Sequence, residues 1–249
     1  MTATQRYFDD IAARMAALAA DGSGAIEATA HAFAAALEGG RPIHVYDSGH
    51  LIAHEFIART GGLAAFTLLT VTADVDRGNE WIAAQRKPTP DEAAASTSAL
   101  VGWVLGQGTI RGGDVLVVSS VSGTSAFVVE LATRAREAGV TVVAVTGVEF
   151  SGRLTSSHPS GKRLFESADV VLDDQVPYGD AALPIDGLDV PVAPWSGLGG
   201  VALLWAATAR AIELSIANGV VPTVFTSYNL PEGAAAYADA RARYRETGR

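Results

Sequence analysis

The chain of 249 residues contains no cysteine, and this absence excludes several kinds of chemistry. Disulfides, thiolate zinc sites, iron–sulfur clusters and cysteine nucleophiles all require the missing side chain. Charged residues are also scarce, at 18% of the chain, whereas 49% of the residues are hydrophobic. This balance excludes a disordered chain, because enough apolar surface is present to form a core.

Basic residues are outnumbered, since 18 Lys and Arg stand against 27 Asp and Glu, a net charge of −9. Nucleic-acid binding depends on a basic surface that neutralises phosphates, so we expect no nucleic-acid partner. The first residues carry acids where a signal peptide has a basic segment, and no apolar run reaches the ~20 residues that span a bilayer. We therefore expect a cytoplasmic protein with no membrane partner.

Apolar strands alternate with helical patterns along most of the chain. The strongest predicted strands are continuous apolar runs at 114–119, 141–146 and 170–173, with shorter ones at 43–46 and 66–71. Helices are predicted at 51–60, 90–107, 125–138, 196–218 and after Pro231, and a pair of helices at 4–38; the segments 81–90 and 174–194 are predicted to be irregular. This order predicts an α/β fold with a parallel sheet covered on both faces, plus an N-terminal helical pair.

A loop rich in hydroxyl groups follows the strand at 114–119, which is where an open parallel sheet binds its ligands. This serine loop, residues 119–125, holds four serines and a threonine around Gly123 and leads into a helix. Hydroxyls, a close backbone and a helix N-terminus together suit a phosphate group. An ordinary Ser/Thr helix cap is the alternative. The patterns of a P-loop, a dinucleotide site and a serine-hydrolase elbow are absent.

Several segments together resemble a known family. The serine loop, its following helix with Gly139 and the strand ending at Thr146 resemble the sugar isomerase (SIS) domain, as does the turn at 48–50. The run Ser-His-Pro-Ser-Gly-Lys-Arg-Leu at 157–164, followed by the segments 168–173 and 179–181, is similar to the phosphoheptose-isomerase-like SIS proteins. The resemblance covers roughly residues 5–235.

This resemblance implies a three-layer αβα sandwich with a five-stranded, flavodoxin-like parallel sheet that binds a sugar phosphate. It also implies a homodimer or homotetramer, with residues 41–235 as the SIS domain, 1–40 as helices for oligomer contact or intramolecular core, and 236–249 as a C-terminal tail. In such proteins the serine loop holds the phosphate, a role that falls here on Ser120, Ser122, Gly123, Thr124 and Ser125. Valine at position 121 removes one hydroxyl that related loops often carry.

Aldose–ketose isomerisation through an enediol needs a base at carbon and an acid at the oxygens. We expect Glu55 and His158 to share this proton transfer, since the resemblance places a glutamate near position 55 and His158 lies in a long polar loop. Predicted substrate contacts outside the serine loop are Ser48, His50, His54 and Lys162. For each of these charged or imidazole groups, a purely structural or solvent-exposed role is the alternative.

We expect no cofactor, although zinc bound by His50, His54, Glu55 and His158 is an alternative that the phosphoheptose isomerases suggest. The tight spacing of a zinc motif is missing. The leading hypothesis is therefore a sugar-phosphate isomerase. Its alternatives are a phosphosugar-binding or regulatory module without chemistry, and a phosphosugar lyase or etherase, because the same base can start an elimination.

Overall fold

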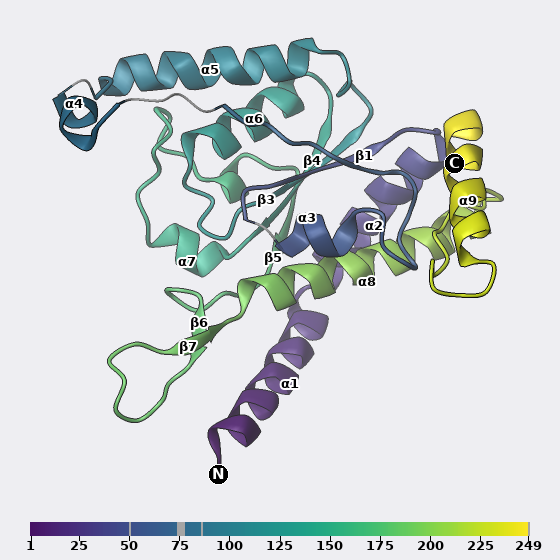
Figure 1. The fold of residues 1–249 in the computed structure, drawn as a ribbon, viewed down its shortest axis with the longest axis horizontal. Coiled ribbons are helices and arrows are strands. Elements are labelled where there is room, and N and C mark those ends of the chain that lie inside the picture. The colour runs from purple at the N-terminus through teal and green to yellow at the C-terminus, as the bar shows by residue number, and fades with distance from the viewer. Residues whose placement is uncertain (50, 74–77, 86, 249) are drawn as a thin grey trace.

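A computed structural model describes residues 1–49, 51–73, 78–85 and 87–248, and its centre is a five-stranded parallel sheet (Figure 1). The strands are β1 (Ile43–Asp47), β2 (Phe66–Leu68), β3 (Val115–Ser119), β4 (Thr141–Thr146) and β5 (Val170–Asp173). Their order across the sheet is β2-β1-β3-β4-β5, and every neighbouring pair is parallel. This is the flavodoxin-like order, so the predicted fold class is confirmed.

Helices cover both faces of the sheet. On one face lie α2 (Ser23–Glu38), α3 (Leu51–Phe56) and α8 (Ser196–Ala217); on the other lie α5 (Pro90–Gly106) and α6 (Ala126–Glu137). Strand β3 shows why both faces need cover: Val115 and Val117 pack with α2 and α8, whereas Leu116 and Val118 pack with α5 and α6. A strand buried on both faces is a continuous apolar run, as the sequence pattern predicted.

The N-terminal helical pair is present, and its two members differ in their packing. Helix α1 (Ala3–Asp21) begins with a capping box between Thr2 and Gln5 and extends away from the body (Figure 1). Helix α2 lies in the main core, where Phe33 is fully buried. By length and composition α8 is the one described helix that could cross a membrane, but its buried residues face α2 and the sheet.

Two segments predicted to be irregular contain regular structure, so those predictions are wrong. Residues 81–90 begin inside a short helix, α4 (Glu80–Gln85), whose N-terminus is capped by the Asn79 side chain accepting the Ile82 N–H. Within 174–194, β6 (Ala181–Leu183) and β7 (Val192–Pro194) form an antiparallel hairpin, the β6–β7 arm. Elements this short carry too little periodicity to be read from sequence.

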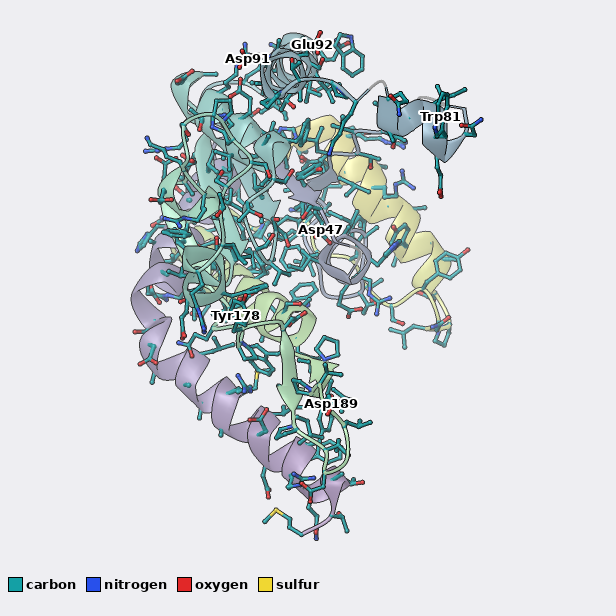
Figure 2. The ribbon with its side chains drawn as sticks, turned by 90° about the vertical axis from the view of Figure 1, so that its left-hand side faces the viewer. Asp47, Trp81, Asp91, Glu92, Tyr178 and Asp189 are labelled. Atoms are coloured by element: carbon teal, nitrogen blue, oxygen red, sulfur yellow. The ribbon has the colours of Figure 1, made fainter. Side chains whose placement is uncertain are left out.

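Other elements are shorter than predicted. Helix α3 ends at Phe56, and Ala58 just beyond it has a left-handed φ of 55°, which stops the helix before Thr60. The remaining elements are α7 (Val148–Gly152), the 3₁₀ turn η1 (Leu164–Glu166) and α9 (Gly233–Thr247). Figure 2 shows Trp81 of α4 and Asp189 of the β6–β7 arm at the periphery, with Asp47 at the end of β1 in the middle of the molecule.

Candidate functional site

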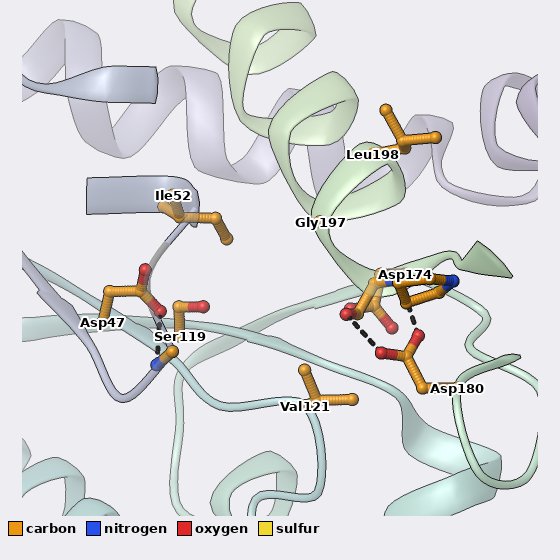
Figure 3. A pocket seen from close by; sticks show the side chains of 11 residues that line it. Asp47, Ile52, Ser119, Val121, Asp174, Asp180, Gly197 and Leu198 are labelled. Atoms are coloured by element: carbon orange, nitrogen blue, oxygen red, sulfur yellow. Dashed lines mark hydrogen bonds between the residues drawn. The ribbon is translucent and has the colours of Figure 1, made fainter. Parts of the chain in front are cut away.

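A cavity of about 280 Å³ opens at the carboxyl ends of β1, β3 and β5, beside the N-terminus of α8 (Figure 3). Parallel sheets bind ligands at this edge, because the loops after neighbouring strands converge there. The lining residues are Asp47, Gly49, Ile52, Ser119, Val121, Asp174, Asp180, Pro194, Ser196, Gly197 and Leu198. The wall therefore combines three carboxyl groups and two hydroxyls with the apolar side chains of Ile52, Val121 and Leu198, which lie at separate places around the cavity.

Two of the three carboxylates are held by main-chain N–H groups. Asp47 accepts the N–H of Gly49 at 3.0 Å and that of Ala53 at 3.1 Å, so it caps the start of α3. Asp180 accepts the main-chain N–H groups of Trp195 and Ser196 at 3.0 and 2.8 Å, and the Ser196 hydroxyl at 2.8 Å. These bonds position the carboxylates at the cavity and satisfy N–H groups that a helix start leaves open.

The third carboxyl group, Asp174, is in a different state. Its residue is only 2% exposed, and Oδ1 has no hydrogen-bond partner. Burial raises the pKa of Asp174 to about 8, the nearby charges of Asp173 and Asp180 add to the increase, and a hydrogen bond from the Val176 N–H opposes it. The carboxyl group is thus mostly protonated at neutral pH and is neutral in a wall whose other acids are engaged.

The serine loop starts in the cavity wall and then leaves it. Ser119 and Val121 line the cavity, whereas the predicted phosphate ligands Ser122, Gly123 and Thr124 lie beyond the lining. Val121 is packed against the core, so the missing hydroxyl at this position is replaced by an apolar surface.

The farther part of the serine loop combines two neighbouring hydroxyl groups, a left-handed glycine and the start of α6. The hydroxyl oxygens of Ser122 and Thr124 are 3.3 Å apart, and Gly123 has a left-handed φ of 58°. A Cβ at Gly123 would come within 3.0 Å of Leu164 Cβ, so this position requires glycine. Ser125 is exposed at the start of α6 and makes no side-chain cap, which leaves that helix end without a hydroxyl cap.

His158 lies near the serine loop but is not among the residues that line the cavity. The Ser157 N–H donates to the Thr124 carbonyl at 2.8 Å, which joins the two loops. His158 Nε2 is 2.9 Å from Glu130 Oε2, and both side chains line a separate hollow between α5 and α6. Lys162 follows in the same loop with an exposed side chain.

The described predicted residues after β1 lie in the turn before α3, which holds Ser48, and on α3 itself, which holds His54 and Glu55. Glu55 lies 3.4 Å from Arg59 and is outside the described lining of the cavity, and His54 and Ser48 are exposed. The prediction for His50 lies outside the described residues. The structure thus places Glu55 and His158 in different surroundings, and their catalytic roles stay predictions.

The parts of the chain that the structure describes contain no cluster of side chains that could hold a metal ion. No three His, Asp or Glu side chains are grouped there as ligands. His158 is paired with Glu130, and Glu55 with Arg59. The absence of a cofactor, like the alternative of zinc, remains a prediction.

The sequence interpretation missed the buried carboxyl group of the cavity wall. Asp174 was not singled out, and Ser196 was read only as the start of a helix. The signal that could have found Asp174 is its position directly after the strand ending at Asp173, since that edge of a parallel sheet is where side chains converge.

The comparisons with known proteins agree with this architecture. The family model for the SIS domain matches residues 6–147, and the chain belongs to the SIS domain family. A UPF0309 protein of Streptomyces coelicolor is 36% identical over 210 residues, covering 84% of this chain and 81% of that protein. A UPF0309 protein of Brucella canis is 34% identical over 235 residues, covering 92% and 90%.

Two solved structures are also similar to the chain. A phosphoheptose isomerase from Francisella tularensis has a TM-score of 0.48 at 19% identity and covers 86% of this chain and 100% of its own. The phosphoheptose isomerase GmhA from Neisseria gonorrhoeae has a TM-score of 0.44 at 19% identity, with coverage of 84% and 98%.

Proposed function

We propose that this protein binds a phosphorylated sugar, with the phosphate on the serine loop and the sugar in the adjoining cavity. The observation that carries the proposal is the continuity of the two: Ser119 and Val121 line the cavity, and the same loop runs on to the start of α6. Membership of the SIS domain family supports a phosphorylated sugar as the ligand.

The charges of the two regions determine whether the phosphate group binds at the serine loop or in the cavity. The cavity is lined by the carboxylates of Asp47 and Asp180, and ionised carboxylates repel a doubly charged phosphate. The start of α6 has the opposite character, because its first N–H groups and the helix dipole favour an anion. The hydroxyls of Ser122, Thr124 and Ser125 add donors there. The phosphate therefore binds at the loop.

The cavity suits the uncharged part of the ligand. A carboxylate oxygen has more than one lone pair, so Asp47 and Asp180 can accept a sugar hydroxyl besides their N–H donors. The hydroxyls of Ser119 and Ser196 can donate or accept, and Ile52 and Leu198 offer apolar contact to the carbon skeleton. Small-molecule pockets start at about 300 Å³, close to the size of this cavity.

The reaction we propose for this site is aldose–ketose isomerisation, with Glu55 and His158 as the proton-transfer groups to test. Glu55 is paired with Arg59 and His158 with Glu130, and neither lines the described cavity. That placement specifically favours a second candidate function, a phosphosugar-binding module without chemistry. Exchange of sugar protons with solvent separates the two.

Ligand binding is tested by thermal stabilisation and calorimetry with inorganic phosphate, sugar phosphates and free sugars. We expect sugar phosphates to stabilise most, phosphate less and free sugars least. The double variant Ser122→Ala/Ser125→Ala should weaken phosphate binding by about a hundredfold or more, since two hydrogen bonds to a charged group are lost and each contributes ~1.5–3 kcal/mol. Ser23→Ala, an exposed serine at the start of α2, is the matched control. Equal affinity in both variants would remove the phosphate from this loop.

The reaction is tested by incubating a bound sugar phosphate in deuterated water. An isomerase introduces deuterium at the carbon beside the carbonyl, and Glu55→Gln or His158→Gln should abolish the exchange if that residue transfers the proton. Binding without any exchange would establish the non-catalytic module instead.

A further inference from the structure

Asp174 is a buried acid in the cavity wall to which the binding scheme above gives no role. It follows β5 directly and lines the cavity at 2% exposure. Its main-chain carbonyl accepts the Trp195 Nε1–H, a contact that fixes the backbone, and the carboxyl group accepts the Val176 N–H. Oδ1 has no partner among the described residues, which is uncommon for a buried polar atom and calls for an explanation.

The charged groups around Asp174 are mostly acids. Asp173 precedes it on β5 and Asp180 caps α8 beside it, while Asp47 lines the same cavity from β1. The guanidinium of Arg14, on α1, lies 5.6 Å from the centre of the Trp195 ring and forms its ion pair with Asp10. No ion pair to Asp174 occurs in the described part of the chain.

A protonated carboxyl group differs from its neighbours in hydrogen bonding. Asp47 and Asp180 accept hydrogen bonds from N–H groups and can only accept. Asp174, with its pKa raised to about 8, carries an O–H at neutral pH. It can therefore donate to a sugar oxygen that has no hydrogen of its own, such as a carbonyl or ring oxygen.

We propose that Asp174 is a specificity-determining residue that donates a hydrogen bond, as the neutral acid, to an oxygen of the sugar in the cavity. The inference rests on the proposed function and deepens it, since the phosphate is held elsewhere. The proposal implies that the bound sugar places an acceptor oxygen next to Asp174, on the β5 side of the cavity. A site built around a buried donor discriminates strongly against analogues that lack the matching group.

The test compares the wild type with Asp174→Asn and Asp174→Ala. Asparagine is neutral and keeps an N–H donor at every pH, whereas alanine removes the group. The probes are inorganic phosphate, which occupies only the loop, and a panel of fructose 6-phosphate, glucose 6-phosphate and ribose 5-phosphate. The measured quantity is the ratio of the two dissociation constants, taken near pH 6.5 and near pH 9. Inorganic phosphate and sugar phosphates titrate at different pH, so each ratio is compared between proteins at the same pH, where the ligand titration is common to all three.

Relative to Asp174→Asn at the same pH, we expect the wild type to lose about tenfold of its preference for a sugar phosphate over phosphate between these pH values, as Asp174 loses its proton. Asp174→Ala should show a weaker preference than Asp174→Asn at both pH values. Binding of inorganic phosphate should be the same in all three proteins, which also verifies that the variants are folded.

Equal ratios in the three proteins, with phosphate and sugar phosphate both bound, would overturn the role of Asp174 and leave the proposed function standing. Failure of the wild type to bind any phosphate would overturn the proposed function, and the role of Asp174 with it. A ¹³C titration of the Asp174 carboxyl carbon, assigned with Asp174→Asn, gives a readout that needs no ligand. A carboxyl already ionised near pH 6 would refute the neutral-donor proposal.

Discussion

Asp114 lies at the amino ends of the strands of the sheet and Asp174 at their carboxyl ends. The two residues are almost equally buried, at 5% and 2% exposure, but their surroundings differ. Asp114 immediately precedes β3, and its carboxylate accepts the Arg111 N–H at 2.9 Å. It also lies 3.4 Å from His44 Nε2 and 3.6 Å from an Arg41 nitrogen. Asp174 immediately follows β5, has acids for neighbours and leaves one oxygen without a partner.

The difference indicates that the amino ends of the strands have a structural role, whereas the carboxyl ends line a cavity that can bind a ligand. At the amino ends of the strands, the buried carboxylate of Asp114 has hydrogen-bond and ion-pair partners that all belong to the protein. At the carboxyl edge, a buried acid retains unused hydrogen-bonding capacity. Unsatisfied buried groups cost stability, so their persistence beside a cavity points to function.

The largest effect should come from replacing the titratable carboxyl group of Asp174 by an amide and following stability with pH. The folded state holds this proton up to about pH 8, whereas the unfolded chain releases it near pH 4. The wild type therefore loses stability as pH rises through this window, by ~1.4 kcal/mol per unit, and Asp174→Asn lacks this loss. Urea unfolding from pH 5 to pH 8 should show the variant gaining about 4 kcal/mol relative to the wild type. Parallel curves for the two proteins would contradict the assignment.

Asp114→Ala should act in the opposite direction. It leaves the Arg111 N–H and the His44 ring without their acceptor in a buried site, so we expect a loss of about 3 kcal/mol in unfolding free energy. Chemical denaturation at neutral pH measures it. The control is Asp186→Ala, an exposed aspartate in the β6–β7 arm, which should change stability by less than ~0.5 kcal/mol. Similar losses in both variants would show that the buried contacts add nothing.

Asp180 tests whether a partnered acid in the cavity behaves like Asp114. Its carboxylate accepts two N–H groups and one hydroxyl at the start of α8. Asp180→Ala should therefore cost about 1–2 kcal/mol, the usual range for losing a helix cap. Thermal unfolding beside Asp189→Ala, an exposed change in the same arm, isolates the cap. A variant as stable as the control would mean that water replaces the carboxylate fully.

The smallest effect concerns His44, the partner of Asp114. Burial lowers the pKa of His44, and the hydrogen bond and charge of Asp114 oppose that shift. The imidazole is thus neutral in the fold, and the unfolded chain takes up its proton below about pH 6.5. This contribution to stability is present above that pH and is lost as pH falls, because only the unfolded chain then takes up the proton readily. His44→Gln should flatten this part of the profile; an unchanged slope would assign it to other groups.

Much of the fold was predictable because its strands obey simple rules. Strands β3 and β4 are buried on both faces, so their sequences are unbroken apolar runs, and Thr89 with Pro90 marks the start of α5. The β6–β7 arm was not predictable, because each strand has three residues and its ends are closed by Asp180 through main-chain contacts. Such contacts leave no periodic pattern in a sequence.

The site was predictable only in outline. The serine loop was found because Gly123 and the surrounding hydroxyls lie together in sequence. Asp174 escaped because Asp173-Asp174 after a strand resembles a solvent-exposed turn. Its burial depends on Trp195, which comes from a segment 21 residues later and donates to its carbonyl. Environments made by residues distant in sequence require the fold to be known.

The attachment of the β6–β7 arm has a consequence for how this protein can change over time. Asp180 directly precedes β6 and bonds to Trp195 and Ser196, which directly follow β7. One side chain therefore holds the two ends of the arm together. Insertions or deletions around Asp189, at the outer part of the arm, leave these bonds and the wall behind them in place. The tip is therefore free to diverge in length and shape among relatives, while the chamber beneath it keeps its form.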